Sequence, residues 1–588
     1  MGQQAEPSNS GGHASSYKSS IPKLSVPSIL NPFRPSAHQP PVQANSTSGE
    51  AKWYSDWKWL NPFSSSITLD ENRAVLPPFR TRPPIYTFYD TTVDKDDAQK
   101  TAEKKLLLIW RRAWWAQGFR PVILSRAEAM NNPLYESLQS KSLDPVLESE
   151  IIRWLAWGHM GTGILSNWLA LPMGPHDDDL LSYLRRGEYP HLTRYENLGS
   201  GFFCGSKQAI NDALKKLLSD KPPTNVKSIV EALGTSAFAV DPQPKAIAFY
   251  DSNVITAKYS KVAEKLVAST ASGLESLSLL INAHLHNIFK SNFGKGIAVL
   301  KPVPQYTTAL VSPALRIATL LSQCPESPMP ATCPPNAPKC HPCVATQPML
   351  ITQPQYFRNT SSLYTVGTVP HPYTFATLTA RRGDIDTKYV RRSTDRDPWV
   401  TVITKELLGT GVSGAPRVVR LKEAIASEFG SSRSLWLVAE YDSKSRYLWP
   451  SSGSGTVTLS SEVFTELDWH FGFMIPRNEE DRGKSDTPVP GPERLPPPPK
   501  PEGPVPSPQE LAVEKELLGK ARDVLMSKEQ RRVGILKVVE AWNLADTEAW
   551  RFARAWEARS RVERLKWEED EKSFLGGGGS GGWGMWHD

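Results

Sequence analysis

The stretch SEIIRWLAWGHMGTGILSNWLALPMG, from Ser149 to Gly174, decides the fold. Its first half carries apolar residues at helical spacing, and Gly161 and Gly163 then break that periodicity. Its second half is a short apolar run, which is typical of a buried strand. The stretch therefore predicts a helix that passes through a glycine turn into a strand, a place where many enzymes that handle nucleotides have their active site.

The segments before this stretch alternate between strand and helix patterns. The run IYTFYDT (85–91) alternates like a strand, and a helix with an acidic start follows it and ends near Gly118. A second strand pattern, FRPVILS, begins at Phe119, and the helical segment after it is interrupted at Pro133. This alternation predicts an α/β fold with a largely parallel sheet.

The segments after it continue the alternation. Residues 198–206 and 244–252 are typical of strands, whereas 207–220 and 273–291 are typical of helices. We therefore expect an α/β domain over 85–323.

The remainder of the chain divides by composition. Residues 350–476 carry four strand-like pieces, the last of which is WHFGFMIP (469–476), and two helical pieces, which predicts a smaller α+β region. After a Pro-rich linker, Ser507 opens a capping box with Glu510, and Asp546 is expected to cap a second helix. The expected segments are a Ser/Pro-rich tail (1–50), a Trp/Pro-rich approach segment (51–84), the α/β domain (85–323), a Cys/Pro-rich insert (324–349), the α+β region (350–476), the linker (477–506), a C-terminal helical region (507–573) and a Gly-rich tail (574–588).

The opening stretch resembles glycosyltransferases of the Rossmann-like A-type fold, in the family related to yeast initiation mannosyltransferases and capsular sugar transferases. The pattern of that family is Ser-Asp-x-x-Arg, an apolar helix, Gly-Gly-x-Tyr, and a strand that bears Asp-x-Asp. The resemblance covers about 85–220, and across its length the chain also resembles uncharacterised fungal proteins. Without gaps, Ser149 and Glu150 fall on the Ser-Asp pair, Arg153 on the arginine, Gly161 on the first glycine, Thr162 on the second, and Ser166 and Trp168 on the two aspartates.

The resemblance implies a site for a nucleotide-sugar. Ser149, Glu150, Arg153, Gly161 and Ser166 would bind the donor, with Arg153 on its diphosphate. In the family, the Asp-x-Asp holds Mg²⁺ or Mn²⁺, because a leaving nucleoside diphosphate carries concentrated negative charge that such a cation neutralises. This sequence departs from the pattern where both aspartates are needed, so we expect a divergent or inactive glycosyltransferase-like protein.

Other acids could supply the charge. Asp90 follows the first strand, and acids at the carboxyl end of a strand are well placed for ligands, although a turn-forming Asp is the alternative. Asp177, Asp178 and Asp179 form a run ten residues beyond the motif, but Asp177 or Asp178 is also a natural N-cap for the next helix. If the protein is active, Asp90 or this run is the candidate catalytic or Mn²⁺/Mg²⁺-binding group.

The cysteines of the insert form a second candidate site. Cys324, Cys333, Cys340 and Cys343 have the spacing C-x8-C-x6-C-x2-C, and the C-x2-C half fits a structural zinc ion. Two disulfides are the alternative if the protein enters an oxidising compartment, and free thiols are the third. The fifth cysteine, Cys204, lies in a strand pattern and is expected in the core.

Histidines give weaker candidates. His284 and His286 are two residues apart in a predicted helix, so they do not share a face and a common metal is not expected. His470 follows Asp468 as a conceivable acid–histidine pair, for which packing within a strand is the preferred interpretation.

Composition limits partners and location. A net charge of +7 over 588 residues, without a dense Lys/Arg block, gives no reason to expect nucleic acid as a partner. No apolar run reaches the roughly 20 residues of a membrane span, and the N-terminus lacks an apolar signal core. We expect an intracellular, cytoplasmic protein, with mitochondrial and secretory routes left open.

A non-enzymatic scaffold is the alternative to a nucleotide-sugar-binding protein. The Trp-rich approach segment, the Pro-rich linker and the C-terminal helices would then bind protein partners, and the α/β domain would serve as a platform.

Overall fold

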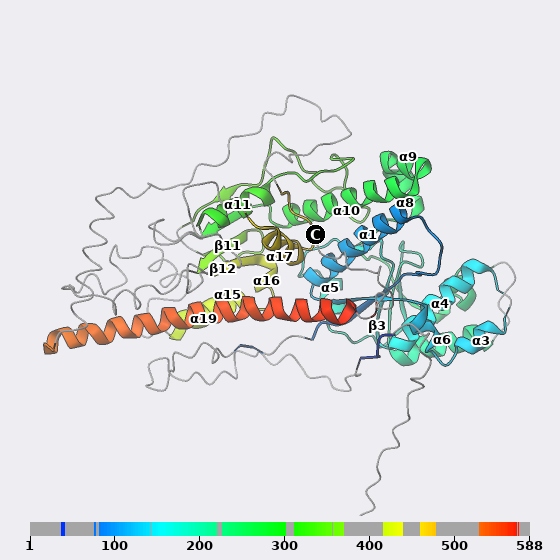
Figure 1. Cartoon of the computed structure of the whole chain (residues 1–588), viewed down its shortest axis with the longest axis horizontal. Coiled ribbons are helices and arrows are strands. Elements are labelled where there is room, and N and C mark those ends of the chain that lie inside the picture. Colours follow the sequence, from blue (N-terminus) through cyan, green and yellow to red (C-terminus); the bar gives the residue numbers. More distant parts are fainter. Residues whose placement is uncertain are drawn as a thin grey trace, which may run out of the picture.

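A computed structural model gives the architecture of the chain (Figure 1). It describes residues 37–41, 76–77, 81–141, 143–219, 226–300, 311–354, 357–369, 415–438, 459–477, 528–572 and 574. The Trp-rich run at 53–59, the Pro-rich linker from 478 onward and the capping box at 507–510 lie outside these residues.

A six-stranded mixed sheet forms the centre of the first half. The strands β1 and β2 are parallel, β1 and β3 are parallel, and β5 and β7 are parallel, whereas β6 runs antiparallel to both β3 and β5. The α/β expectation is therefore confirmed at the level of class, although the sheet is mixed. In spatial order the strands are β2 (Arg120–Leu124), β1 (Pro84–Phe88), β3 (Gly163–Ser166), β6 (Phe202–Gly205), β5 (Thr193–Tyr195) and β7 (Ala239–Asp241).

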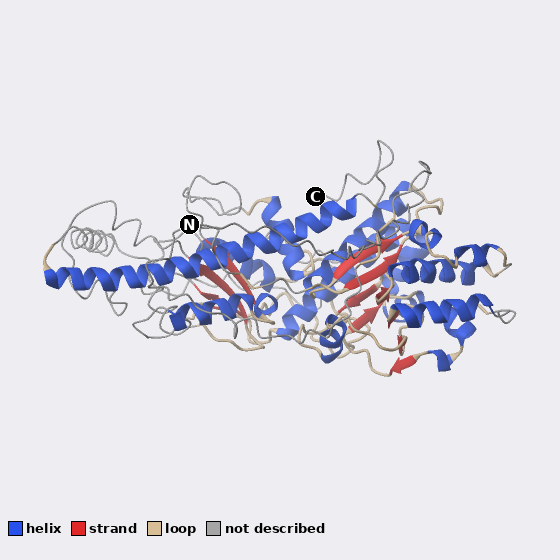
Figure 2. Cartoon of the chain, turned by 90° about the horizontal axis from the view of Figure 1, so that it is seen from below, coloured by secondary structure: helices blue, strands red, loops and turns tan. Residues whose placement is uncertain are grey.

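Helices cover both faces of this sheet, because neighbouring side chains of each strand point to opposite sides. Ile85 packs in the core beneath α1 (Asp97–Ala116) and α10 (Thr270–Asn292). Its neighbour Tyr86 packs in a second core beneath α4 (Pro145–Met160) and α6 (Lys207–Ser219). Figure 2 shows the strands seen between these helical layers.

Local signals set the ends of the first helices. Asp96 caps α1 by accepting a hydrogen bond from Gln99 N at 2.6 Å, and Gly118, with φ +88°, follows its last turn. The predicted break at Pro133 separates α2 (Arg126–Met130) from α3 (Tyr135–Gln139).

Short elements complete this half. A two-stranded antiparallel sheet lies beside the main one and joins β4 to β8. Its strands and the remaining short helices are β4 (Ala170–Pro172), β8 (Ile247–Phe249), α5 (Asp179–Arg185), α7 (Ile229–Leu233), η2 (Thr235–Ala237), α8 (Ser252–Lys258) and α9 (Ser260–Ala268).

A second sheet of four strands, with all its pairings parallel, occupies the other half. One of its strands, β9, comes directly after α10, so this sheet uses residues on both sides of the Cys/Pro-rich insert. The elements are, in sheet order, β10 (Ile351–Thr352), β9 (Ile297–Leu300), β11 (Tyr364–Val369) and β12 (Ser434–Val438), with the helices α11 (Val311–Ser322), α15 (Ala415–Ala426), α16 (Gly430–Arg433) and α17 (Ser461–Phe471).

The predicted strand at 469–476 is wrong. Its first residues form the last turn of α17, which Ser460 caps by accepting a hydrogen bond from Val463 N at 3.4 Å. Gly472, with φ +80°, ends the helix, and the residues beyond it form a loop. The cap and the apolar spacing of α17 outweigh the strand propensity of its aromatic residues.

The C-terminal helix α19 (Gln530–Lys572) ties the two halves together. It is continuous through residue 546, so the predicted helix start at Asp546 is wrong. Figure 1 shows it, in orange and red, passing along α15 toward the first sheet. Phe552 packs with residues of α15 and β12, and Trp567 packs against Trp115 of α1 and Trp469 of α17. Among the described helices, none has both the length and the apolar character needed to cross a bilayer.

Candidate functional site

The helix, turn and strand of the opening stretch form as predicted. Asp144 caps α4, accepting a hydrogen bond from Val146 N at 2.8 Å, and α4 ends at Gly161. Gly161 has φ +91°, a backbone conformation that residues other than glycine rarely adopt. The chain then enters β3, which lies between β1 and β6 in the middle of the sheet.

Ser166, on the first of the two Asp-x-Asp positions, lies in the core. Its side chain is fully buried, and its Oγ accepts a hydrogen bond from Trp110 Nε1 at 3.3 Å and donates one to Asn167 O at 2.9 Å. Trp168, on the second position, is partly buried and packs against the same core. These two positions do not fit a Mg²⁺ or Mn²⁺ ion, because one is a buried hydroxyl and the other an indole.

Arg153 is bound within the protein. Its Nη1 donates a hydrogen bond to Ser200 O at 2.8 Å, which ties α4 to the turn before β6. Its Nη2 is also buried, and burial lowers the pKa of the guanidinium to about 10. The arginine therefore links two structural elements and does not present its second nitrogen to solvent.

The other two pattern residues on α4, Glu150 and Ser149, differ in their surroundings. Glu150 Oε2 accepts a hydrogen bond from Ile229 N at 2.8 Å, so its carboxylate caps the N-terminus of α7. Ser149 is exposed on α4.

Asp90 forms a turn at the carboxyl end of β1. Its Oδ1 accepts hydrogen bonds from Thr92 N at 2.9 Å and Thr92 Oγ1 at 2.6 Å, and its Oδ2 pairs with Arg126 Nε at 2.8 Å. Burial alone would raise the pKa of this carboxyl, but the bonds from Thr92 and Arg126 hold it below the usual value. This matches the turn-forming alternative.

The acidic run at 177–179 lies near the amino ends of the strands, whereas Asp90 lies at their carboxyl ends. Gly118, just before β2, is adjacent to the side chains of His176 and Arg185, and Pro83, just before β1, is adjacent to Gly187. The amino ends of β1 and β2 are therefore beside α5, whereas Asp90 follows the carboxyl end of β1. Asp90 and the acidic run cannot serve one site.

Each acid of the run has a structural position. Asp178 caps α5, accepting hydrogen bonds from Leu180 N at 2.9 Å and Leu181 N at 3.3 Å, as the capping alternative predicts. Asp177 Oδ2 pairs with Arg433 Nη2 at 2.8 Å, and Asp179 is exposed in the first turn of α5. Nowhere in the described parts of the chain do three or more His, Cys, Asp or Glu side chains gather as they would around a metal ion.

The insert cysteines form disulfides, which corrects the preferred zinc interpretation. Cys324 pairs with Cys343 and Cys333 with Cys340, each with Cα atoms 5.6 Å apart. Sulfurs bonded to one another are not thiolates, so they cannot ligate zinc. Sequence spacing could not decide this, because two nested pairs and a four-sulfur site use the same spacing.

Hydrogen bonds hold the insert against the first half. Tyr259 donates its hydroxyl hydrogen to Cys333 O at 2.8 Å, and Asn336 Nδ2 donates to Met173 O at 2.8 Å and to Lys245 O at 2.7 Å. His284 Nε2 lies 3.1 Å from Thr332 Oγ1.

The remaining sequence candidates are core residues. His284 Nδ1 lies 2.7 Å from Tyr250 Oη, and His286 Nε2 lies 2.8 Å from Leu321 O, so the two rings contact different groups. Burial lowers the pKa of each histidine to about 3, so both are neutral at pH 7. Cys204 is fully buried, and burial raises the pKa of its thiol to about 11, as expected for a core cysteine.

The family model described as domain of unknown function DUF8765 matches residues 47–588. The chain belongs to the DUF8765 family. No curated protein and no solved structure matches it.

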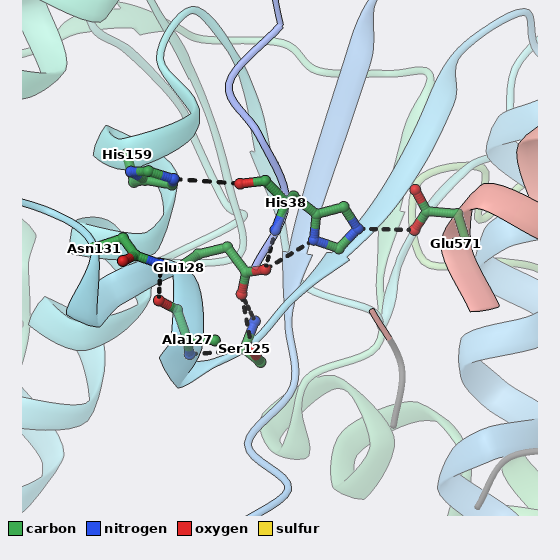
Figure 3. Close-up of polar contacts among 7 residues, drawn as sticks. All are labelled: His38, Ser125, Ala127, Glu128, Asn131, His159 and Glu571. Atoms are coloured by element: carbon green, nitrogen blue, oxygen red, sulfur yellow. Dashed lines mark hydrogen bonds and ion pairs between the residues drawn. The ribbon is translucent and has the colours of Figure 1, made fainter. Parts of the chain in front are cut away.

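The DUF8765 protein carries a charged cluster that the sequence did not reveal (Figure 3). His38, which is buried, lies between two carboxylates: its Nδ1 is 2.8 Å from Glu128 Oε1, and its Nε2 is 3.2 Å from Glu571 Oε2. Burial alone would lower the pKa of His38, but the two carboxylates raise it to about 9, so the imidazole is cationic at pH 7. The ring also stacks on Phe574 at 3.9 Å. No local pattern marks this histidine, because its partners are 90 and 533 residues away.

A second buried ion cluster replaces the conceivable acid–histidine pair. Asp468 Oδ2 lies 3.4 Å from Arg112 Nη1 and 2.7 Å from Arg477 Nη2, and its Oδ1 accepts from Ile475 N at 3.1 Å. His470 instead faces Tyr364, with Nε2 2.8 Å from its Oη. Asp468 therefore joins α1, α17 and the loop after α17.

A groove lies beside the edge strand β7. It has a volume of about 490 Å³ and is lined by α6, α7 and the strand ends, with Asp212, Lys216 and His191 as its charged or titratable residues. None of the residues that the glycosyltransferase pattern predicts lines this groove.

Proposed function

We propose that this DUF8765 protein has a glycosyltransferase-like first half in which the donor position has become structural core, and that it acts by binding and not by sugar transfer. The observation that carries the proposal is Ser166: the residue at the first metal-binding position is fully buried and hydrogen-bonded to Trp110. A donor diphosphate could not reach it without opening the core between α1 and β3.

The surroundings of the other pattern residues support the same proposal. Arg153 and Glu150 each bind the backbone of another element, at Ser200 and Ile229. The acids that could replace the Asp-x-Asp lie at opposite ends of the strands. Asp90 shapes a turn at one end, and Asp178 caps α5 at the other. A transferase would need a cluster of such groups around one diphosphate.

Thermal unfolding with a panel of nucleotide-sugars tests the proposal. Uridine-, guanosine- and cytidine-diphosphate or -monophosphate sugars would be added with and without Mn²⁺, to wild type and to Arg153→Met. A donor at 100 times its Kd would stabilise the protein by about 2.7 kcal/mol. We expect no such rise in Tm and no release of nucleotide. A rise with one sugar that Mn²⁺ increases and Arg153→Met removes would contradict the proposal.

The binding surface that we favour is the outward face of α19. Val562 and Leu565 are one turn apart on this helix and are 62% and 43% exposed, although the opposite face, with Trp567, is buried against α1 and α17. This surface belongs to the C-terminal helical region that the scaffold hypothesis assigned to protein partners.

Site-specific photo-crosslinking checks this surface. A photoreactive residue at position 562 should give a discrete crosslinked protein band in cell extract. Position 267 is the matched control, because Val267 is also an exposed valine, at 91%, but lies on α9. Equal crosslinking from both positions would argue against a defined partner at α19.

A further inference from the structure

The outer disulfide of the insert has a cation against one of its sulfurs. Lys290, in the last turn of α10, places its Nζ 2.7 Å from Cys343 Sγ and 3.3 Å from Ser322 O. Cys324 and Cys343 are both partly exposed, so a small molecule can approach the bond. Among the described residues, no cationic side chain donates a hydrogen bond to either sulfur of the inner bond, Cys333–Cys340.

We propose that the Cys324–Cys343 disulfide is a thiol-exchange site, at which a small-molecule thiol such as glutathione becomes bound to Cys324. The thiolate of the small molecule attacks Cys324 Sγ and forms a new S–S bond. The Cys324–Cys343 bond breaks, and Cys343 leaves with the electron pair as a thiolate. No net oxidation occurs in this step, because one disulfide replaces another.

The position of Lys290 sets the direction of attack. Exchange is faster when the departing sulfur is the better leaving group, and a neighbouring ammonium stabilises a thiolate. Lys290 touches Cys343 and therefore favours departure of that sulfur, while its Nζ also occupies one approach to it. A second small-molecule thiolate can then attack the small-molecule sulfur of the mixed disulfide. Its S–S bond to Cys324 breaks, Cys324 leaves as a thiolate, the oxidised small-molecule disulfide is released, and both cysteines are reduced.

The rest of the insert would stay in place during exchange. Its contacts through Cys333 O, Asn336 and Thr332 do not involve the outer bond. Opening the outer bond would free only the link between the end of α11 and the segment that leads to β10. The exchange is therefore a local modification and not an unfolding of the insert.

The test follows the four cysteines of the insert in the intact chain. The protein, purified without reductant, is incubated with glutathione at several ratios of reduced to oxidised form, quenched with N-ethylmaleimide, digested and quantified by mass spectrometry. We expect the Cys324–Cys343 bond to open before Cys333–Cys340, with the glutathione adduct on Cys324. Lys290→Met should slow this opening about tenfold, as expected for a poorer leaving thiolate.

Two controls separate this effect from a general loss of structure. Lys290→Arg keeps a cation beside Cys343 and should react at close to the wild-type rate. Lys339→Met removes an exposed lysine next to Cys340 and should leave the rate for Cys324–Cys343 unchanged. Four freely alkylated cysteines before any reduction, equal opening of both bonds, an adduct on Cys343, or an unchanged rate in a folded Lys290→Met protein would each overturn the proposal.

Discussion

Trp110 donates its indole hydrogen to Ser166 across the interface between α1 and β3, at 3.3 Å and out of contact with water. The bond places the side chain at residue 166 on the α1 side of the sheet, inside the larger core. In this protein, the strand end that resembles a metal-binding site therefore anchors a helix.

Substitution of Ser166 by Asp should not create a metal site. A carboxylate there would be buried beside Trp110 and should lower the free energy of unfolding by at least about 2 kcal/mol. Denaturant unfolding measures the loss. Asn167→Asp is the matched control, because its Oδ1 can still accept from Leu169 N and its change should be below about 1 kcal/mol. Mn²⁺ binding by Ser166→Asp would contradict this expectation.

The buried ion cluster of Asp468 should contribute far more to the free energy of unfolding than the exposed ion pair of Asp177. Asp468→Ala leaves Arg112 without its buried counter-charge and should cost about 3–5 kcal/mol. Asp177→Ala removes a pair with Arg433 in which the Asp is 42% exposed, and should cost less than about 1 kcal/mol. Chemical denaturation of both variants gives the comparison. Similar losses would mean that the Asp468 cluster is not tightly packed.

The stability of the protein should depend on pH through His38. Its pKa is raised from 6.5 to about 9 in the folded protein, so its contribution is complete below pH 6.5 and is lost as the pH rises toward 9. The full effect is at most about 3 kcal/mol. The difference in unfolding free energy between wild type and His38→Gln should shrink from pH 6 to pH 9.5. A difference that is constant over this interval would show that His38 is not held between the two carboxylates.

Trp567 should control the attachment of α19 to the first half. Its ring stacks on Trp115 at 4.6 Å and lies 5.6 Å from Trp469, with Arg111 above it at 4.5 Å. Trp567→Ala removes this packing, worth about 3–5 kcal/mol, and should speed hydrogen exchange and proteolysis in the last turns of α19. Val562→Ser, on the exposed face of the same helix, should leave both rates unchanged.

Much of the fold could be predicted because its signals are local. The acidic start of α1, the glycine after it and the break at Pro133 are readable within a few residues, and the structure has each of them. The same kind of signal was available for α17, where Ser460 and Gly472 bracket a helical apolar pattern. There the aromatic residues of 469–473 favour a strand, but the cap at Ser460 and the left-handed Gly472 decide for a helix.

The site could not be predicted because its determinants are distant in sequence. The gapless alignment to the family pattern puts Ser166 at the end of a strand, where the structure has it. Only the packing of Trp110 shows that this strand end is buried. The sequence offers Asp90 or the run at 177–179 as the charged group, and only the sheet shows that they lie at opposite ends of its strands. Cysteine spacing was likewise compatible with zinc and with disulfides, and the three-dimensional pairing distinguishes them.

The order of the strands has a practical consequence for dissecting the protein. Strand β9 follows α10 of the first half but lies between β10 and β11 of the second sheet. A fragment that stopped at residue 323 would leave β9 with no strand to pair with. A fragment that started there would lack an inner strand of its own sheet. Neither half should be expressible alone as a well-folded unit, so binding partners are best sought with the chain intact.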